Sequence, residues 1–108
     1  MRFAETVYAA VSRFPKEEQY VLATQVRRAV ISIPSNIAEG FGRATKDDYL
    51  HFLVMARGSL FEVGTQVELS RRLGYLQEEQ FLIISEMRSD LGRKLNAYIK
   101  SLKKSDHK

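Results

Sequence analysis

Apolar residues recur at the spacing of an α-helix through nearly the whole chain, and this periodicity is the strongest constraint on its fold. The first segment carries its stripe at Phe3, Val7, Val11 and Phe14, and later stripes follow the same three- and four-residue steps. No segment shows the apolar and polar alternation of a half-buried strand. Four such segments with short loops predict an all-α fold, an antiparallel up-and-down four-helix bundle with residues 1–108 as one domain.

Proline and glycine mark the expected ends of the first two helices. The first helix should run from about Arg2 to Arg13, where Pro15 interrupts it. Pro15 also suits the first turn of the second helix, which should run to about Gly40. Because the second apolar stripe continues in phase across Pro34, we expect one kinked helix, with a break into two helices as the alternative.

The third and fourth helices have clearer caps. Thr45 is expected to cap the third helix, which runs to about Leu73 with Gly74 as a left-handed C-cap. The fourth helix is expected from Gln77 to about Leu102, with a basic tail that frays from about residue 103. Its predicted apolar stripe is Ile84, Met87, Leu91, Leu95, Tyr98 and Leu102.

The third helix has an unusually wide apolar face. Its apolar positions span about 200° of the helical wheel, whereas an outer helix of a monomeric bundle needs a little over about 100°. One interpretation is that this helix is the most central of the bundle. The other is that a second stripe, Leu50, Val54 and Phe61, joins subunits. Arg57 falls inside the same arc, where it needs a partner or must extend its head to water.

A polar ridge follows one side of the second helix and has a polar counterpart on the third. The ridge is a solvated face or a hydrogen-bonded network at a helix or subunit contact. Glu39 is the expected partner of Arg57 or Arg43. The candidate network or interface residues are Gln25, Arg28, Ser32, Asn36, Glu39, Arg43, Arg57, Ser59 and Glu62.

Composition leaves little room for catalysis. There is no Cys, which excludes thiolate chemistry and disulfides and suits a reducing cytoplasm. His51 and Asp47 share one helical face, which predicts a surface ion pair rather than a metal site, and His107 lies in the expected frayed tail. The longest apolar run is five residues, too short for a membrane span. We therefore expect no enzyme activity, no catalytic residues, no cofactor and no metal.

The remaining functional signal is positive charge. The chain carries a net charge of +4, but its basic residues concentrate toward the end of the fourth helix. Such a helix end could contact phosphates, although cations also suit a helix C-terminus and keep proteins dissolved. The candidate nucleic-acid-binding residues are Arg88, Arg93, Lys94, Lys100, Lys103 and Lys104, with Asp90 the single acid among them.

Two long motifs carry a family resemblance. The first reads Ser-Ile-Pro-Ser-Asn-Ile-Ala-Glu-Gly over residues 32–40, followed by Gly42 and Arg43. The second reads Ala-Arg-Gly-Ser over residues 56–59, followed by Glu62, Gln66 and Leu-Gly-Tyr at residues 73–75. With these motifs the chain resembles the four helix bundle protein family, first noted as proteins encoded in intervening sequences of bacterial 23S ribosomal RNA genes. The resemblance covers residues 14–99.

The resemblance implies a bundle that assembles into a homopentameric barrel. Members of that family usually carry additional helix before the position that corresponds to Met1, so the first helix here is short for the family. The chain is more distantly similar to the accessory variability protein of diversity-generating retroelements. We therefore expect a homo-oligomeric bundle that binds RNA or DNA, or a nucleic-acid-associated protein. The alternatives are a protein-binding scaffold without nucleic-acid contact and an accessory subunit of a reverse transcriptase.

Overall fold

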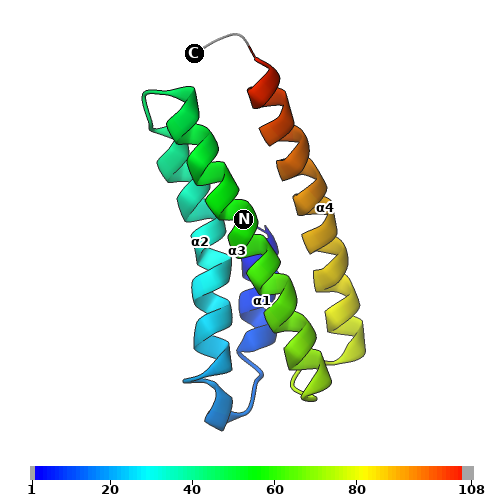
Figure 1. Cartoon of the computed structure of the whole chain (residues 1–108). Coiled ribbons are helices and arrows are strands. Elements are labelled where there is room, and N and C mark those ends of the chain that lie inside the picture. The colour runs from blue at the N-terminus through cyan, green and yellow to red at the C-terminus, as the bar shows by residue number, and fades with distance from the viewer. Residues whose placement is uncertain (1, 106–108) are drawn as a thin grey trace.

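The computed structural model describes residues 2–105, and within that range all regular structure is helical. The elements are α1 (Arg2–Val11), the 3₁₀ turn η1 (Lys16–Glu18), α2 (Leu22–Phe41), α3 (Lys46–Arg72) and α4 (Glu78–Lys104). Successive α-helices run in opposite directions (Figure 1), so the expected antiparallel up-and-down arrangement is confirmed.

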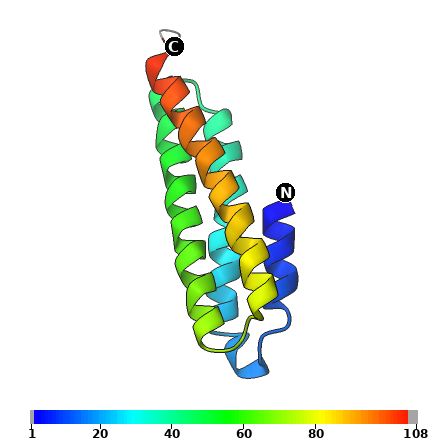
Figure 2. The same cartoon turned by 90° about the vertical axis from the view of Figure 1, so that its right-hand side faces the viewer.

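The first helix covers only part of the bundle. α1 has 10 residues, whereas α3 and α4 have 27 each. It lies against α2 and α4 in the half of the molecule that holds the α3–α4 turn (Figure 2). The other half therefore consists of α2, α3 and α4 alone, within a molecule measuring 49 × 23 × 18 Å. None of the helices within residues 2–105 is long and apolar enough to cross a bilayer.

The core follows the predicted stripes with one exception. Residues of α2 and α3 form its centre, where Ile33, Leu53 and Leu60 are at most 1% exposed. On α4 the prediction placed Tyr98 inside, but its side chain is 43% exposed and Ile99 is buried instead. Ile99 continues the four-residue step from Leu95. Tyr98 is turned toward α3, where its hydroxyl accepts a hydrogen bond from the Tyr49 hydroxyl. The prediction for Tyr98 was therefore wrong by one position.

The link between α1 and α2 is a turn rather than helix. The second helix was expected to begin at Pro15, but residues 16–18 form a 3₁₀ turn and α2 begins at Leu22. The Gln19 side-chain amide donates to the carbonyls of Val11 and Phe14, at 3.2 and 3.0 Å. It thereby connects the turn to the end of α1 and to the residues that follow it.

The remaining helix ends mostly agree with the sequence. α2 continues through Pro34 as a single helix, as expected. The Thr45 hydroxyl accepts a hydrogen bond from the Asp48 backbone N–H at 3.1 Å, and Gly74 has a φ of 83°. The fraying expected from residue 103 is wrong for Lys103 and Lys104, which are both helical. Residues 106–108 of the expected tail, with His107 among them, lie outside the described residues.

Candidate nucleic-acid interface

The six basic residues predicted to bind nucleic acid do not form one patch. The Arg88 side chain lies across Gly64 of α3, so that a Cβ at Gly64 would be 2.8 Å from Arg88 Cδ. Arg93 and Lys94 both pair with Asp90, at 3.3 and 3.1 Å. These hydrogen bonds and charges lower the pKa of Asp90, Lys94 contributing most. Half of the predicted set therefore already has contacts within the chain.

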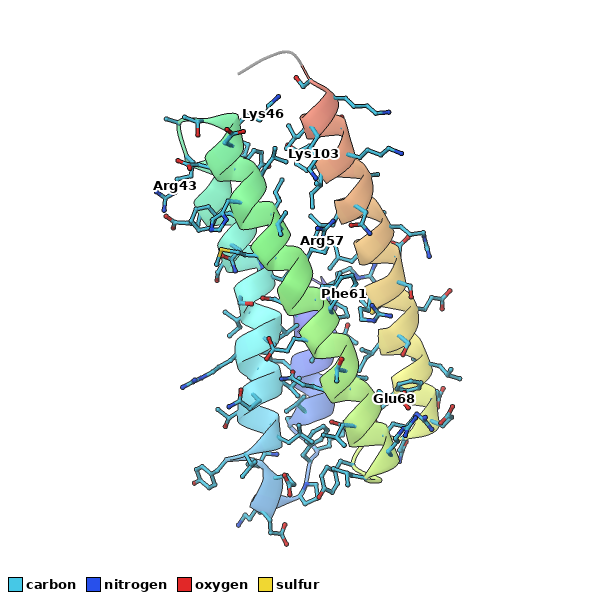
Figure 3. The ribbon with its side chains drawn as sticks, in the orientation of Figure 1. Arg43, Lys46, Arg57, Phe61, Glu68 and Lys103 are labelled. Atoms are coloured by element: carbon cyan, nitrogen blue, oxygen red, sulfur yellow. The ribbon has the colours of Figure 1, made fainter. Side chains whose placement is uncertain are left out.

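The other three residues gather at one end of the bundle. Lys100, Lys103 and Lys104 are exposed and form no ion pair with any residue in the range 2–105. Lys46 of α3 joins them, because its ammonium group donates to the Ser105 carbonyl at 2.6 Å. Figure 3 shows Lys46 and Lys103 at this end, near the loop between α2 and α3. We call this region, with Arg43 included, the basic end.

Carboxylates also occur at the basic end. Glu39 pairs with Arg43 at 2.9 Å, which is one of the two partners predicted for it. Asp47 and Asp48 lie in the first turn of α3, where the positive end of the helix dipole stabilises negatively charged side chains. The described residues of the basic end thus hold five cations against three carboxylates, and the excess of positive charge is moderate.

Three aromatic rings from three helices lie in a row at the basic end. Phe41, the last residue of α2, meets Tyr49 of α3 edge-on at 6.1 Å between ring centroids. Tyr49 in turn meets Tyr98 of α4 at 6.0 Å, and its hydroxyl donates to that of Tyr98 at 3.1 Å. Burial, with that hydrogen bond, raises the pKa of Tyr49 from 10.0 to about 12, so the hydroxyl stays neutral under physiological conditions.

A hollow of about 250 Å³ opens beside this aromatic row. Arg43, Lys46 and Tyr49 contribute to its wall, and Leu102 closes it from α4. A guanidinium, an ammonium group and a phenol thus border one concavity. Such a combination can contact a phosphate and a planar ring at the same time.

Arg57 has a different partner from the predicted one. Its guanidinium donates to the Asn96 side-chain carbonyl on α4 at 3.0 Å, whereas Glu39 is already paired with Arg43. Asn96 had no role in the sequence interpretation. Because Arg57 points from α3 toward α4 (Figure 3), it cannot reach the far side of α2.

The predicted polar ridge forms only a short network. The hydroxyls of Ser32 on α2 and Ser59 on α3 are hydrogen-bonded, and Asn36 donates to the Ser32 carbonyl at 2.7 Å. Gln25 and Arg28 are exposed and do not join this network. On α3, Glu62 accepts from Gln66 at 3.3 Å, one turn away. The ridge is therefore part helix contact and part solvated face.

The candidate oligomer stripe is apolar surface on α3. Val54 is 40% exposed and Phe61 is 56% exposed, whereas Leu50 is half-buried and packs against the core. Phe61 borders a groove of about 570 Å³ that also contains Phe81 and Arg88 of α4. Phe61 is open to solvent there, whereas the Arg71 guanidinium lies over the Phe81 ring, 4.7 Å from its centroid.

One further prediction concerns His51 of α3. His51 packs edge-on against Phe52 at 5.6 Å and forms no ion pair with Asp47 within the described chain, so the predicted pair was wrong. At the opposite end, Glu68 accepts from Arg71 and Arg72 at 2.7 and 2.8 Å. The hydrogen bond from Arg72, and then that from Arg71, lowers the pKa of Glu68.

The sequence interpretation missed Lys46 and the aromatic row. A signal for Lys46 was available, because antiparallel neighbours place the start of the third helix beside the end of the fourth. Phe41 gave a weaker signal, since an aromatic residue next to helix-ending glycines is typical of a packed cap as well as of a binding surface.

Comparison with known proteins decides the family. The family model described as "23S rRNA-intervening sequence protein" matches residues 1–97. The chain belongs to this family. It is also similar to the crystal structure of a protein with unknown function from the S23 ribosomal protein family of Bacteroides thetaiotaomicron, with a TM-score of 0.82 and 24% identity. That match covers 92% of this chain and 93% of the other and shows the same fold. None of the curated proteins compared with the chain matches it.

Proposed function

We propose that this family member is a non-enzymatic, homo-oligomeric helical bundle in the cytoplasm that binds nucleic acid through its basic end. The observation that carries the proposal is the grouping of Lys46 with Lys100, Lys103 and Lys104 where α3 begins and α4 ends. Lys100, Lys103 and Lys104 are exposed and form no ion pair with any residue in the range 2–105, so they can neutralise phosphates without first breaking such a pair. The family's association with 23S ribosomal RNA genes is consistent with such a partner.

Assembly into a homopentamer, which the family resemblance implies, is the second part of the proposal. Val54 and Phe61 expose apolar surface on α3 that a second copy would bury. A ring of copies would bring several basic ends together, and the resulting positive field would be stronger than that of one chain. A scaffold that binds only other proteins would use the same apolar surface, and the experiments below separate the two functions.

The nucleic-acid proposal is tested by a charge-matched pair of variants. In the first, Lys100, Lys103 and Lys104 become alanine; in the second, Arg88, Arg93 and Lys94 become alanine. Both lose three positive charges, but only the first changes the basic end. Affinity for a labelled RNA is measured by fluorescence anisotropy across a salt series. A plot of log affinity against log salt concentration has a negative slope. If all three lysines contact phosphates, the first variant should reduce the magnitude of this slope by about two to three.

The second variant should retain most of the wild-type slope. Equal losses in both variants would place binding elsewhere or show that only overall charge matters. Absence of RNA and DNA binding by the wild type at low salt would contradict the proposal and favour the protein scaffold.

Assembly is tested independently by light scattering at micromolar concentration. The wild type should give an oligomer, and Phe61→Ser should shift it toward the monomer because a polar residue replaces a large apolar contact. Tyr20→Ser is the matched control, since Tyr20 is 89% exposed but lies outside the α3 stripe. A monomeric wild type would exclude the assembly part of the proposal while leaving the nucleic-acid part open to its own test.

A further inference from the structure

The aromatic row at the basic end is more exposed than the fold requires. The Phe41 side chain is 76% exposed, although it is a large apolar group on the last turn of a well-packed helix. The Tyr98 side chain is 43% exposed on α4. Tyr49 lies between them and is half-buried, so it holds the row in place while the outer two rings face solvent.

Cations, rather than a continuous apolar surface, lie beside the middle ring of this row. Arg43 and Lys46 border the same hollow as Tyr49. The Arg43 guanidinium is held both by Glu39 and by the face of the Phe52 ring, 4.7 Å from its centroid. This arrangement places positive charge beside Tyr49, the ring that links the two exposed ones, which is unlike the apolar centre and polar rim of a protein–protein contact.

We propose that the basic end binds unpaired nucleotides, with a base stacked on Phe41 and the adjoining phosphates near Lys46 and Arg43. The inference rests on the proposed nucleic-acid function and specifies its substrate as single-stranded RNA or DNA. In a duplex each base face is covered by the neighbouring pair, so an exposed ring gains little from contact with it. In a single strand the base faces are free, and cations combined with aromatic rings form the usual binding surface.

The charge at this end favours the same conclusion. Asp47 and Asp48 stand among the cations, so electrostatic attraction alone is limited. A duplex-binding surface depends mainly on phosphate contacts and would be weakened by these carboxylates. Stacking supplies affinity that neighbouring carboxylates do not oppose, because it acts on the uncharged base.

The experiment compares a labelled oligo-uridine strand with a blunt RNA duplex of equal length, by anisotropy at low salt. The wild type should bind the single strand more tightly than the duplex. Phe41→Ala should weaken single-strand binding about fivefold or more and leave duplex binding nearly unchanged. Phe41→Tyr should restore binding, because it keeps the ring. Circular dichroism confirms that each variant remains folded.

Tyr20→Ala is the matched control, since Tyr20 is also exposed but lies at the other end of the bundle. It should bind like the wild type. A second measurement uses a strand that carries a fluorescent adenine analogue, whose emission falls when the base stacks. Binding of the wild type should quench this emission, and Phe41→Ala should abolish the quenching.

The outcomes separate the two proposals. Equal wild-type affinity for strand and duplex, or unchanged single-strand binding by Phe41→Ala, would overturn the stacking inference while lysine-dependent binding could still stand. Absence of binding to either RNA at low salt would overturn both.

Discussion

α3 packs against its two larger neighbours in different ways. Toward α2 the contact is close and mainly apolar, although the Ser32 and Ser59 hydroxyls are hydrogen-bonded across it. Ile33 and Leu60 are completely buried, and a Cβ added at Gly40 would lie only 2.7 Å from Phe52 Cβ. Toward α4, side-chain hydrogen bonds contribute at several levels, including Arg57 to Asn96 at 3.0 Å and Tyr49 to Tyr98 at 3.1 Å. The α2–α3 interface depends mainly on shape, and the α3–α4 interface depends to a larger extent on exchangeable polar contacts.

This difference matters because α4 carries the lysines of the basic end. A net hydrogen bond contributes only about 1 kcal/mol, since water can replace either partner. α1 does not cover α4 in that half of the molecule (Figure 2). The end of α4 can therefore adjust to a ligand at lower cost than the α2–α3 pair, which would have to open a packed core.

The largest expected effect is in the α2–α3 core. Ile33→Ala removes a side chain that is completely buried and leaves a cavity that close-packed neighbours cannot fill. We expect a loss of about 2–5 kcal/mol in the free energy of unfolding, measured with urea. Leu102→Ala on α4 is the comparison, because Leu102 is only half-buried and borders an open hollow. A loss for Leu102→Ala as large as that for Ile33→Ala would show that the two interfaces do not differ as described.

The close approach of α2 and α3 is tested by Gly40→Ala. The added Cβ would meet Phe52 Cβ, which cannot move without its backbone, so the helices must separate. We expect a net loss of about 1–2 kcal/mol after allowing for the better helix propensity of alanine. Gly58→Ala on α3 should have the opposite sign, because no atom lies within 4 Å of the added group and alanine gains about 0.5–1 kcal/mol in a helix. Urea unfolding at low protein concentration measures both, and equal signs would contradict the contrast.

The α3–α4 contact is tested by a double-mutant cycle on Arg57 and Asn96. Each alanine variant should lose little stability, because both groups remain accessible to water when unpaired. The coupling free energy should be about 0.5–1 kcal/mol. A coupling indistinguishable from zero would mean that the hydrogen bond is incidental and that apolar contacts alone hold α4.

Periodicity predicted the helices and most of the core because burial of an apolar stripe depends on the helix's own geometry. Val7, Ile84 and Leu95 were assigned correctly for that reason. Tyr98 was assigned incorrectly because adjacent positions lie only about 100° apart and a tyrosine is compatible with either environment. The neighbour across the interface decides such cases, and that neighbour is not visible in one helix.

Pairing between helices was harder to predict than burial. Glu39 and Asn96 are both plausible partners for Arg57 on a helical wheel, but they belong to helices on different sides of α3. Likewise, counting six cations along α4 did not reveal that Asp90 pairs with two of them or that Lys46 joins three others. These features depend on the axial register of the helices, which sequence periodicity leaves undetermined.

The last predicted effect is a pH dependence at the α3–α4 contact. The pKa of Tyr49 is raised from 10.0 to about 12 by burial and by its hydrogen bond to Tyr98. Above pH 10.0 the unfolded chain loses this proton while the folded chain keeps it, so stability should fall as the pH rises from 10.0 toward 12. Tyr49→Phe should make this decline shallower, as measured by urea unfolding across that range. Part of the decline in stability should remain in Tyr49→Phe, because burial and the Glu18 carboxylate also raise the pKa of Tyr75. Identical pH profiles for the wild type and Tyr49→Phe would show that the hydroxyl pair does not hold α4 against α3.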